Sequence, residues 1–110
     1  MNAFYMRRAE LLLHQAREFC FEISCDHRRF LHMAFTDRHG YSHIYSASSI
    51  DGFIHELALE IWGRPPETEE RLALKEILSS RLALFRRLHP ESRVYVDLST
   101  VAEKGVKSEN

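Results

Sequence analysis

The chain has 110 residues, a length that a single domain with a modest core can fill without disulfides. Its 15 basic and 16 acidic residues nearly cancel, which argues against a general binder of nucleic acid or of membrane surfaces. Two cysteines are too few for a disulfide framework, and no apolar run approaches the roughly 18 residues of a membrane span. We therefore expect a cytoplasmic protein with reduced thiols, no signal peptide and no membrane association.

A first helix is predicted over residues 3–24, where apolar side chains recur at helical spacing from Tyr5 to Ile23. Cys20 falls on the apolar side of this helix and is expected in the core. Phe21 falls on the opposite side, among charged residues such as Arg17. Phe21 is therefore either an ordinary exposed aromatic residue or a contact residue for a partner.

Residues 28–46 predict a β-hairpin. Gly40 can adopt positive φ and Asp37 can hydrogen-bond its own backbone, so the turn is centred on His39 and Gly40. This register pairs Phe35 with Ile44 and places four apolar residues on a core face: Leu31, Met33, Phe35 and Ile44. The opposite face is polar and aromatic, and is either solvated or a contact surface: His32, Ala34, Thr36, His43, Tyr45 and Ala47.

A second helix is predicted over residues 49–62. The run from Ser48 to Asp51 resembles a capping box, and Gly63 suits the position after the last helical residue. Leu59 and Trp62 lie off the core stripe of this helix. An aromatic residue beside an exposed leucine is typical of an interface, so both are candidate partner-binding residues.

A third helix is predicted from residue 66 or 67 to about residue 88. Arg81 lies in the middle of its apolar stripe. This arginine either pairs with a carboxylate of a neighbouring element or recognises an anion or a partner. Residues 93–98 alternate with period two and predict a third strand. Residues 101–110 form a polar tail that is expected to fray, and no internal repeat is predicted.

The predicted order is α-β-β-α-α-β. We expect an α+β fold, a two-layer sandwich whose small antiparallel sheet is packed against helices. The sheet consists of the hairpin and the C-terminal strand, because a lone hairpin is marginally stable in water. Residues 1–100 form a single domain in this prediction.

A zinc site is one alternative for the polar residues. Cys20, Cys25, His39 and His43 come close to the spacing of a two-cysteine, two-histidine zinc finger. In such a finger the thiolates come from a hairpin and the imidazoles from the following helix. Here that order is reversed and Cys20 is expected in the core. We therefore expect no cofactor, with zinc as the alternative.

Catalytic motifs are not recognisable in this sequence. The one thiol–imidazole combination is Cys25 with His27, and no residue is identified that would orient such a base. We therefore expect a non-enzymatic protein.

The predicted function is binding of another protein, as an inhibitor, adaptor, chaperone-like factor or regulator, with a homodimer as one form of it. The alternative is a nucleic-acid-binding module that stacks single strands on a basic and aromatic hairpin. The candidate partner-binding residues are His32, His43, Tyr45, Tyr41, Arg28, Arg29, Arg38, Leu59, Trp62 and Phe21.

Overall fold

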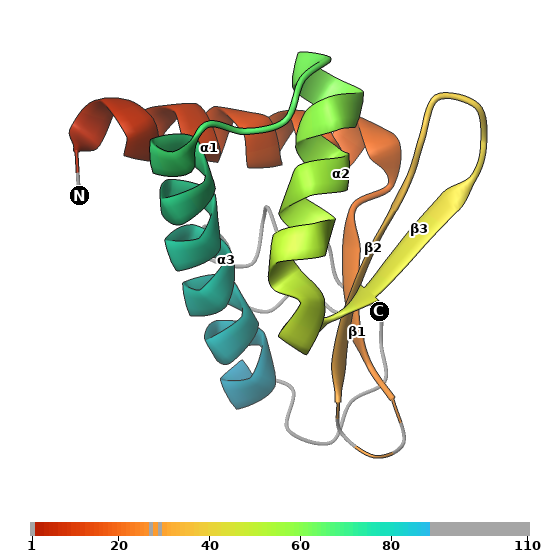
Figure 1. Cartoon of the computed structure of the whole chain (residues 1–110). Helices are drawn as coiled ribbons and strands as arrows, with labels where there is room; N and C mark the ends of the chain where they lie inside the picture. The colour runs from red at the N-terminus through yellow and green to blue at the C-terminus, as the bar shows by residue number, and fades with distance from the viewer. Residues whose placement is uncertain (1, 27, 29, 89–110) are drawn as a thin grey trace.

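The computed structural model describes residues 2–26, 28 and 30–88 (Figure 1). Within these residues the elements are α1 (Ala3–Gln15), η1 (Ala16–Phe19), β1 (Glu22–Cys25), β2 (Leu31–Thr36), β3 (Ser42–Ser46), η2 (Ala47–Ser49), α2 (Ile50–Trp62) and α3 (Thr68–Leu88). The predicted strand at residues 93–98 and the polar tail at residues 101–110 lie outside the described residues.

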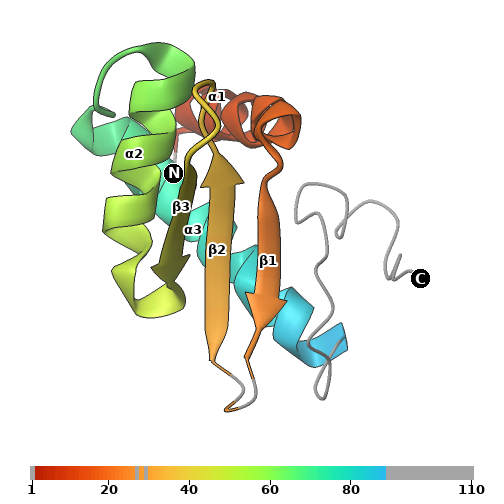
Figure 2. The ribbon, with the colours of Figure 1, turned by 90° about the vertical axis from the view of Figure 1, so that its right-hand side faces the viewer.

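The strands form an antiparallel sheet in the order β1-β2-β3, and the helices pack on one of its faces (Figures 1 and 2). This arrangement confirms the predicted α+β class. Leu31, Met33 and Phe35 of β2 point toward the helices and are buried, as predicted. We call the other face of the sheet, which is turned toward the viewer in Figure 2, the open face.

Phe53 of α2 is the aromatic centre of the core. It is fully buried, and three rings from the sheet side surround it. Their centroids lie 5.6 Å away for Phe21, 5.8 Å for Phe35 and 6.0 Å for Tyr45. Such tilted and edge-to-face contacts stabilise aromatic pairs beyond the area that they bury.

The first helix ends nine residues earlier than predicted, and this is the largest error of the prediction. After the short turn η1, Cys20 adopts the left-handed conformation with φ 56°. The amide of Phe21 then donates to the carbonyl of Ala16, which closes the helix end. This conformation usually belongs to glycine, so a cysteine gives no sequence signal for it.

Glu22–Cys25, where the first helix was predicted to continue, form β1, an edge strand of the sheet. Phe21, Ile23 and Cys25 are buried, whereas Cys20 is exposed. The predictions that Cys20 lies in the core and that Phe21 is available to a partner are therefore wrong. Apolar residues at alternate positions in this segment fit a strand as well as a helix, and the left-handed residue decides between them.

The pairing of β2 with β3 is shifted by one residue from the prediction. Phe35 pairs with His43, whereas the predicted partner was Ile44. The loop has three residues, 38–40, because the amide of Asp37 donates to the carbonyl of Tyr41 at 2.8 Å. Gly40, with φ 91°, supplies the left-handed residue that such a loop requires.

This shift exchanges the two faces of β3. His43 and Tyr45 face the helices, not the open face, and Ile44 is 68% exposed instead of lying in the core. Tyr45 lies so close to α2 that a Cβ on Gly52 would come within 3.1 Å of its ring. Burial, with a smaller contribution from the charge of Glu56, raises the pKa of the Tyr45 hydroxyl.

The two later helices confirm their predicted ranges to within one or two residues. Gly63 ends α2 in the left-handed conformation, as predicted. The capping box does not form, because the side chain of Ser49 makes no capping bond and the Ser48 hydroxyl bonds that of Ser46. Arg81 extends from α3 to Glu10 of α1, which confirms the pairing alternative.

Candidate functional site

The β2–β3 turn is closed by the side chain of Asp37. Its Oδ1 accepts hydrogen bonds from the amides of His39 and Tyr41, each at 2.9 Å. Its Oδ2 lies 2.9 Å from Nε2 of His43. These bonds lower the pKa of Asp37, and the bond with His43 has the largest influence. We call this arrangement an Asp–His clamp.

The β1–β2 turn contains the same clamp. Oδ1 of Asp26 accepts from the amides of Arg28 at 2.9 Å and Phe30 at 3.0 Å, and Oδ2 lies 2.9 Å from Nε2 of His32. The hydrogen bond with His32 is the largest of the interactions that lower the pKa of Asp26 to about 2. Both clamps follow the pattern Asp-x3-aromatic-x-His. This short repeat was not predicted.

The two clamps lie at opposite ends of β2 and on opposite faces of the sheet. Asp37 and His43 are on the helix side, where the His43 ring stacks on Phe35 with centroids 4.7 Å apart. His32 alternates with the buried residues of β2, so it lies on the open face together with Asp26. His32 and Phe35, the residue that pairs with His43, are an odd number of residues apart on β2, so the two histidines lie on opposite faces.

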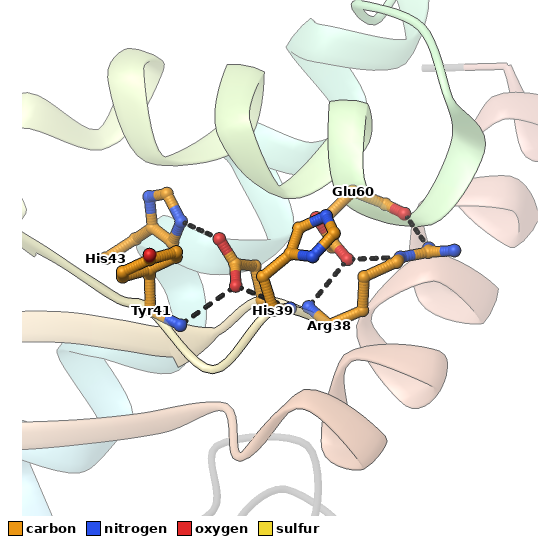
Figure 3. Close-up of polar contacts among 6 residues, drawn as sticks. Arg38, His39, Tyr41, His43 and Glu60 are labelled. Atoms are coloured by element: carbon orange, nitrogen blue, oxygen red, sulfur yellow. Dashed lines mark hydrogen bonds and ion pairs between the residues drawn. The ribbon is translucent and has the colours of Figure 1, made fainter.

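Arg38 ties the β2–β3 turn to α2 (Figure 3). Its amide donates to Oε2 of Glu60 at 3.0 Å, its Nε donates to the same oxygen, and its Nη2 donates to the Glu60 carbonyl. The guanidinium also lies 5.9 Å from the ring centroid of Phe19. The hydrogen bonds from Arg38 lower the pKa of Glu60.

We call residues 38–41 the tip. Its side chains at His39 and Tyr41 are exposed, and Tyr41, at 71%, is the most exposed large apolar residue in the described part of the chain. The tip is therefore held at its base by the clamp and at its side by Glu60, while its aromatic residue faces solvent.

Leu59 and Trp62 lie near the end of α2 that holds Glu60. Leu59 is 38% exposed. Trp62 is half-buried beside two guanidinium groups, with its ring centroid 4.9 Å from Cζ of Arg8 and 5.1 Å from Cζ of Arg64. The structure thus places both predicted residues at the surface, and Trp62 in contact with two arginines that the sequence did not indicate.

Glu70 joins these two arginines, and its side chain is only 3% exposed. It accepts two bonds from Arg64 at 2.8 Å, one from Arg8 at 3.0 Å and one from the amide of Glu67 at 2.8 Å. The bonds from Arg64, followed by those from Glu67 and Arg8, lower the pKa of Glu70 to about 2 although burial opposes this. The junction of α1, α2 and α3 is therefore a paired charge network.

The predicted partner-binding residues do not form one surface. Arg38 and Tyr41 lie at one end of the sheet, whereas Arg28 and His32 lie at the other. Phe21 is buried, and Arg29 lies outside the described residues.

The four predicted zinc ligands do not converge. Cys20 precedes β1, and Cys25 is buried at the far end of that strand. His39 and His43 belong to the other hairpin, where His43 is bonded to Asp37. No group of three or more His, Cys, Asp and Glu side chains in residues 2–26, 28 and 30–88 is placed to hold a metal ion.

An aspartate that orients a histidine is also a feature of catalytic sites. Here the other carboxylate oxygen of each aspartate closes a turn, and the same pair occurs at both turns. The arrangement is therefore explained by turn formation. Cys25 is buried, and its predicted partner His27 lies outside the described residues.

No known family matches this chain. Comparisons with protein-family models, with curated proteins and with solved structures each found no match. Within the described residues, no helix is both long enough and apolar enough to cross a membrane.

Proposed function

We propose that this chain binds another protein and that the tip enters a concave site on that partner. The observation that carries the proposal is the combination of high exposure and firm attachment in one loop. Tyr41 is 71% exposed, while the backbone amides of Arg38 and Tyr41 at the two ends of the tip are bonded to Glu60 and Asp37. The proposed role is that of an inhibitor, adaptor, chaperone-like factor or regulator, without catalysis.

Attachment of the tip favours binding because association normally has to order loops and side chains. The amides of Arg38, His39 and Tyr41 are already bonded within the fold. A partner would therefore meet a loop that is ordered before contact. Loops held in this way by a rigid scaffold commonly carry binding residues.

Tyrosine is well suited to the centre of an interface. Its ring buries a large apolar area, and its hydroxyl can find a hydrogen-bond partner in a pocket. A turn that projects from a sheet requires a concave counterpart. The matching partner site is an apolar depression with a polar group at its base.

Stacking of single-stranded nucleic acid on the hairpin has less support. It would need His43 and Tyr45 beside Tyr41 on one exposed surface, but both face the helices. Arg38 is engaged by Glu60 and is less available to a phosphate. Protein binding through the tip requires only the exposed side chain of Tyr41 and no rearrangement of the hairpin.

The proposal can be tested with a photo-reactive amino acid introduced in native host cells at position 41 or, in a matched variant, at position 44. Ile44 is an appropriate control because it is 68% exposed on the strand that follows the tip. We expect a defined cross-linked protein from position 41 and not from position 44. The same adducts from both positions, or none from position 41, would contradict the proposal.

Purified components then give the quantitative test. The variant Tyr41→Ser should weaken binding of the cross-linked partner at least about tenfold, as expected for a central aromatic residue. The variant Ile44→Ser should bind within about twofold of the unmodified protein. If single-stranded RNA is retained in place of a protein, the nucleic-acid alternative takes over.

A further inference from the structure

A pocket of about 330 Å³ lies beside the β1–β2 turn, at the end of the sheet opposite the tip. Three separate parts of the chain line it: residues 30–32 of the first hairpin, residues 46–48 between β3 and α2, and Arg86 in the last turn of α3. Figures 1 and 2 show the β1–β2 turn, the start of α2 and the end of α3 toward the same end of the molecule. The volume is at the lower end of the range for small-molecule sites.

Hydrogen-bond donors dominate the polar part of this pocket. Arg86 lines the pocket and has no hydrogen bond or ion pair within the described part of the chain, and no Asp or Glu is among the residues that line it. The hydroxyls of Ser46 and Ser48 lie 2.8 Å apart. One of them donates to the other, so the second keeps its own O–H for a ligand.

The two arginines near pocket-lining residues in the sequence are also positively charged. Arg28 of the turn and Arg87 of α3 are exposed near the pocket-lining residues Phe30 and Arg86. The nearest carboxylate in the turn, Asp26, already accepts two amides and the imidazole of His32. An acceptor-rich, negatively charged group therefore suits this pocket.

Phe30 provides an apolar wall. Its ring is 57% exposed, although it lines the pocket together with Leu31 and Ala47. A planar ring of a ligand could stack on this surface, with the adjoining anionic group directed toward Arg86.

The attraction of an arginine to the C-terminal end of a helix would by itself account for Arg86 in the last turn of α3. It would not account for the convergence of this guanidinium with two hydroxyls and an exposed aromatic ring from other elements. We propose that this pocket binds a small organic anion of mononucleotide size, with a phosphate or carboxylate at Arg86 and a planar ring on Phe30.

The test uses the full chain and three probes: 5′-AMP, adenosine without the phosphate, and inorganic phosphate without the ring. Binding is followed by isothermal titration calorimetry and by amide shifts in heteronuclear NMR spectra. We expect 5′-AMP to bind at least about tenfold more tightly than either fragment, with shifts at residues 30–32 and 46–48. Equal affinities for 5′-AMP and adenosine, or no saturable shifts, would overturn the proposal.

Adjacent arginines provide the matched variants. Arg86→Gln should weaken 5′-AMP binding at least about tenfold, whereas Arg87→Gln should leave it within about twofold, because Arg87 does not line the pocket. Equal losses in both variants would indicate attraction by general positive charge and not a site. Phe30→Ala should weaken binding of 5′-AMP without changing that of phosphate.

A 5′-phosphorylated tetranucleotide distinguishes a free ligand from a strand end. A small-molecule site should bind it no more tightly than 5′-AMP. Markedly tighter binding of the tetranucleotide would assign the pocket to nucleic acid and would overturn the proposal. Neither result bears on the tip, which lies at the other end of the sheet.

Discussion

The two turns of the sheet share one design and differ in their surroundings. Each has an aspartate that closes the turn, an aromatic residue four positions later and a histidine two positions after that. At the β2–β3 turn the Asp–His pair packs against Phe35 and the loop is tied to Glu60. At the β1–β2 turn the same pair lies on the open face, and the aromatic residue borders a pocket.

This difference shows what a local motif determines and what it leaves to its context. The clamp fixes the path of the backbone in both places. Whether the aromatic residue projects as a probe, like Tyr41, or lines a depression, like Phe30, is decided by the neighbouring elements. The same seven-residue pattern therefore supports two different kinds of surface.

Removal of the clamp aspartates should have the largest effect and should separate the two turns. Asp37 is 13% exposed and Asp26 is 33% exposed, so water can replace the lost bonds more readily at Asp26. We expect Asp37→Ala to lower Tm by about 8 °C and Asp26→Ala by about 3 °C in thermal unfolding followed by circular dichroism. Asp51→Ala, which removes exposed ion pairs of α2, is the control and should change Tm little. Equal losses for the two clamps would remove the distinction.

Weakening the bonds between Arg38 and Glu60 should have a smaller effect on stability, and this effect should be confined to the β2–β3 turn. Glu60→Gln weakens the acceptor for Arg38 and should lower the free energy of unfolding by no more than about 1 kcal/mol, because Arg38 is largely exposed. Amide hydrogen exchange should become faster at Arg38. The amides of Arg28 and Phe30, in the other turn, should exchange at unchanged rates. Faster exchange in both turns would show that Glu60 acts on the whole sheet.

The smallest expected effect is the loss of stability at acidic pH. The folded-state pKa of Asp26 is about 2, below the ordinary value of 3.8, so its contribution to stability is complete above about pH 4 and is lost as the pH falls toward 2. The lowered pKa of Asp37 acts in the same direction. In His32→Ala the pKa of Asp26 should rise toward 3.8 while that of Asp37 stays the same, as measured by NMR titration of the carboxyl carbons. An unchanged pKa of Asp26 would refute the role of His32.

Regular elements with matching local signals were predictable from the sequence. The ranges of α2 and α3 follow from helical periodicity together with Gly63 and the two following prolines, which stop α2. The buried face of β2 follows from alternation. In these segments, local preference and burial agree.

Two local features, each involving one residue, made the predictions wrong for the end of the first helix and for the register of β3. Cys20 in a left-handed conformation ends the turn η1 that follows α1 and allows β1 to begin, and no residue type indicates it in the sequence. A loop of three residues in place of two shifts β3, and the faces of His43, Ile44 and Tyr45 change with it. Both errors carried over directly to the candidate sites, because the face of a strand decides which side chains a partner can reach.

The clamp pattern itself was visible in the sequence and could have corrected the register. An aspartate that accepts from amides two and four residues later requires a loop longer than two residues. The occurrence of the same spacing at Asp26 made the pattern stronger. Glu60 and Glu70, by contrast, have partners far along the chain or in a junction of three helices, and no local pattern identifies them.

The contacts of Trp62 with Arg8 and Arg64 also give the protein an intrinsic fluorescent reporter. Trp62 is the single tryptophan of the chain, so its fluorescence originates entirely from the junction of the three helices. Tryptophan emission therefore reports unfolding of the helical layer. The NMR signals of the amides in the two turns report unfolding of the sheet. Unfolding curves recorded by both signals on one sample will show whether the two layers melt together.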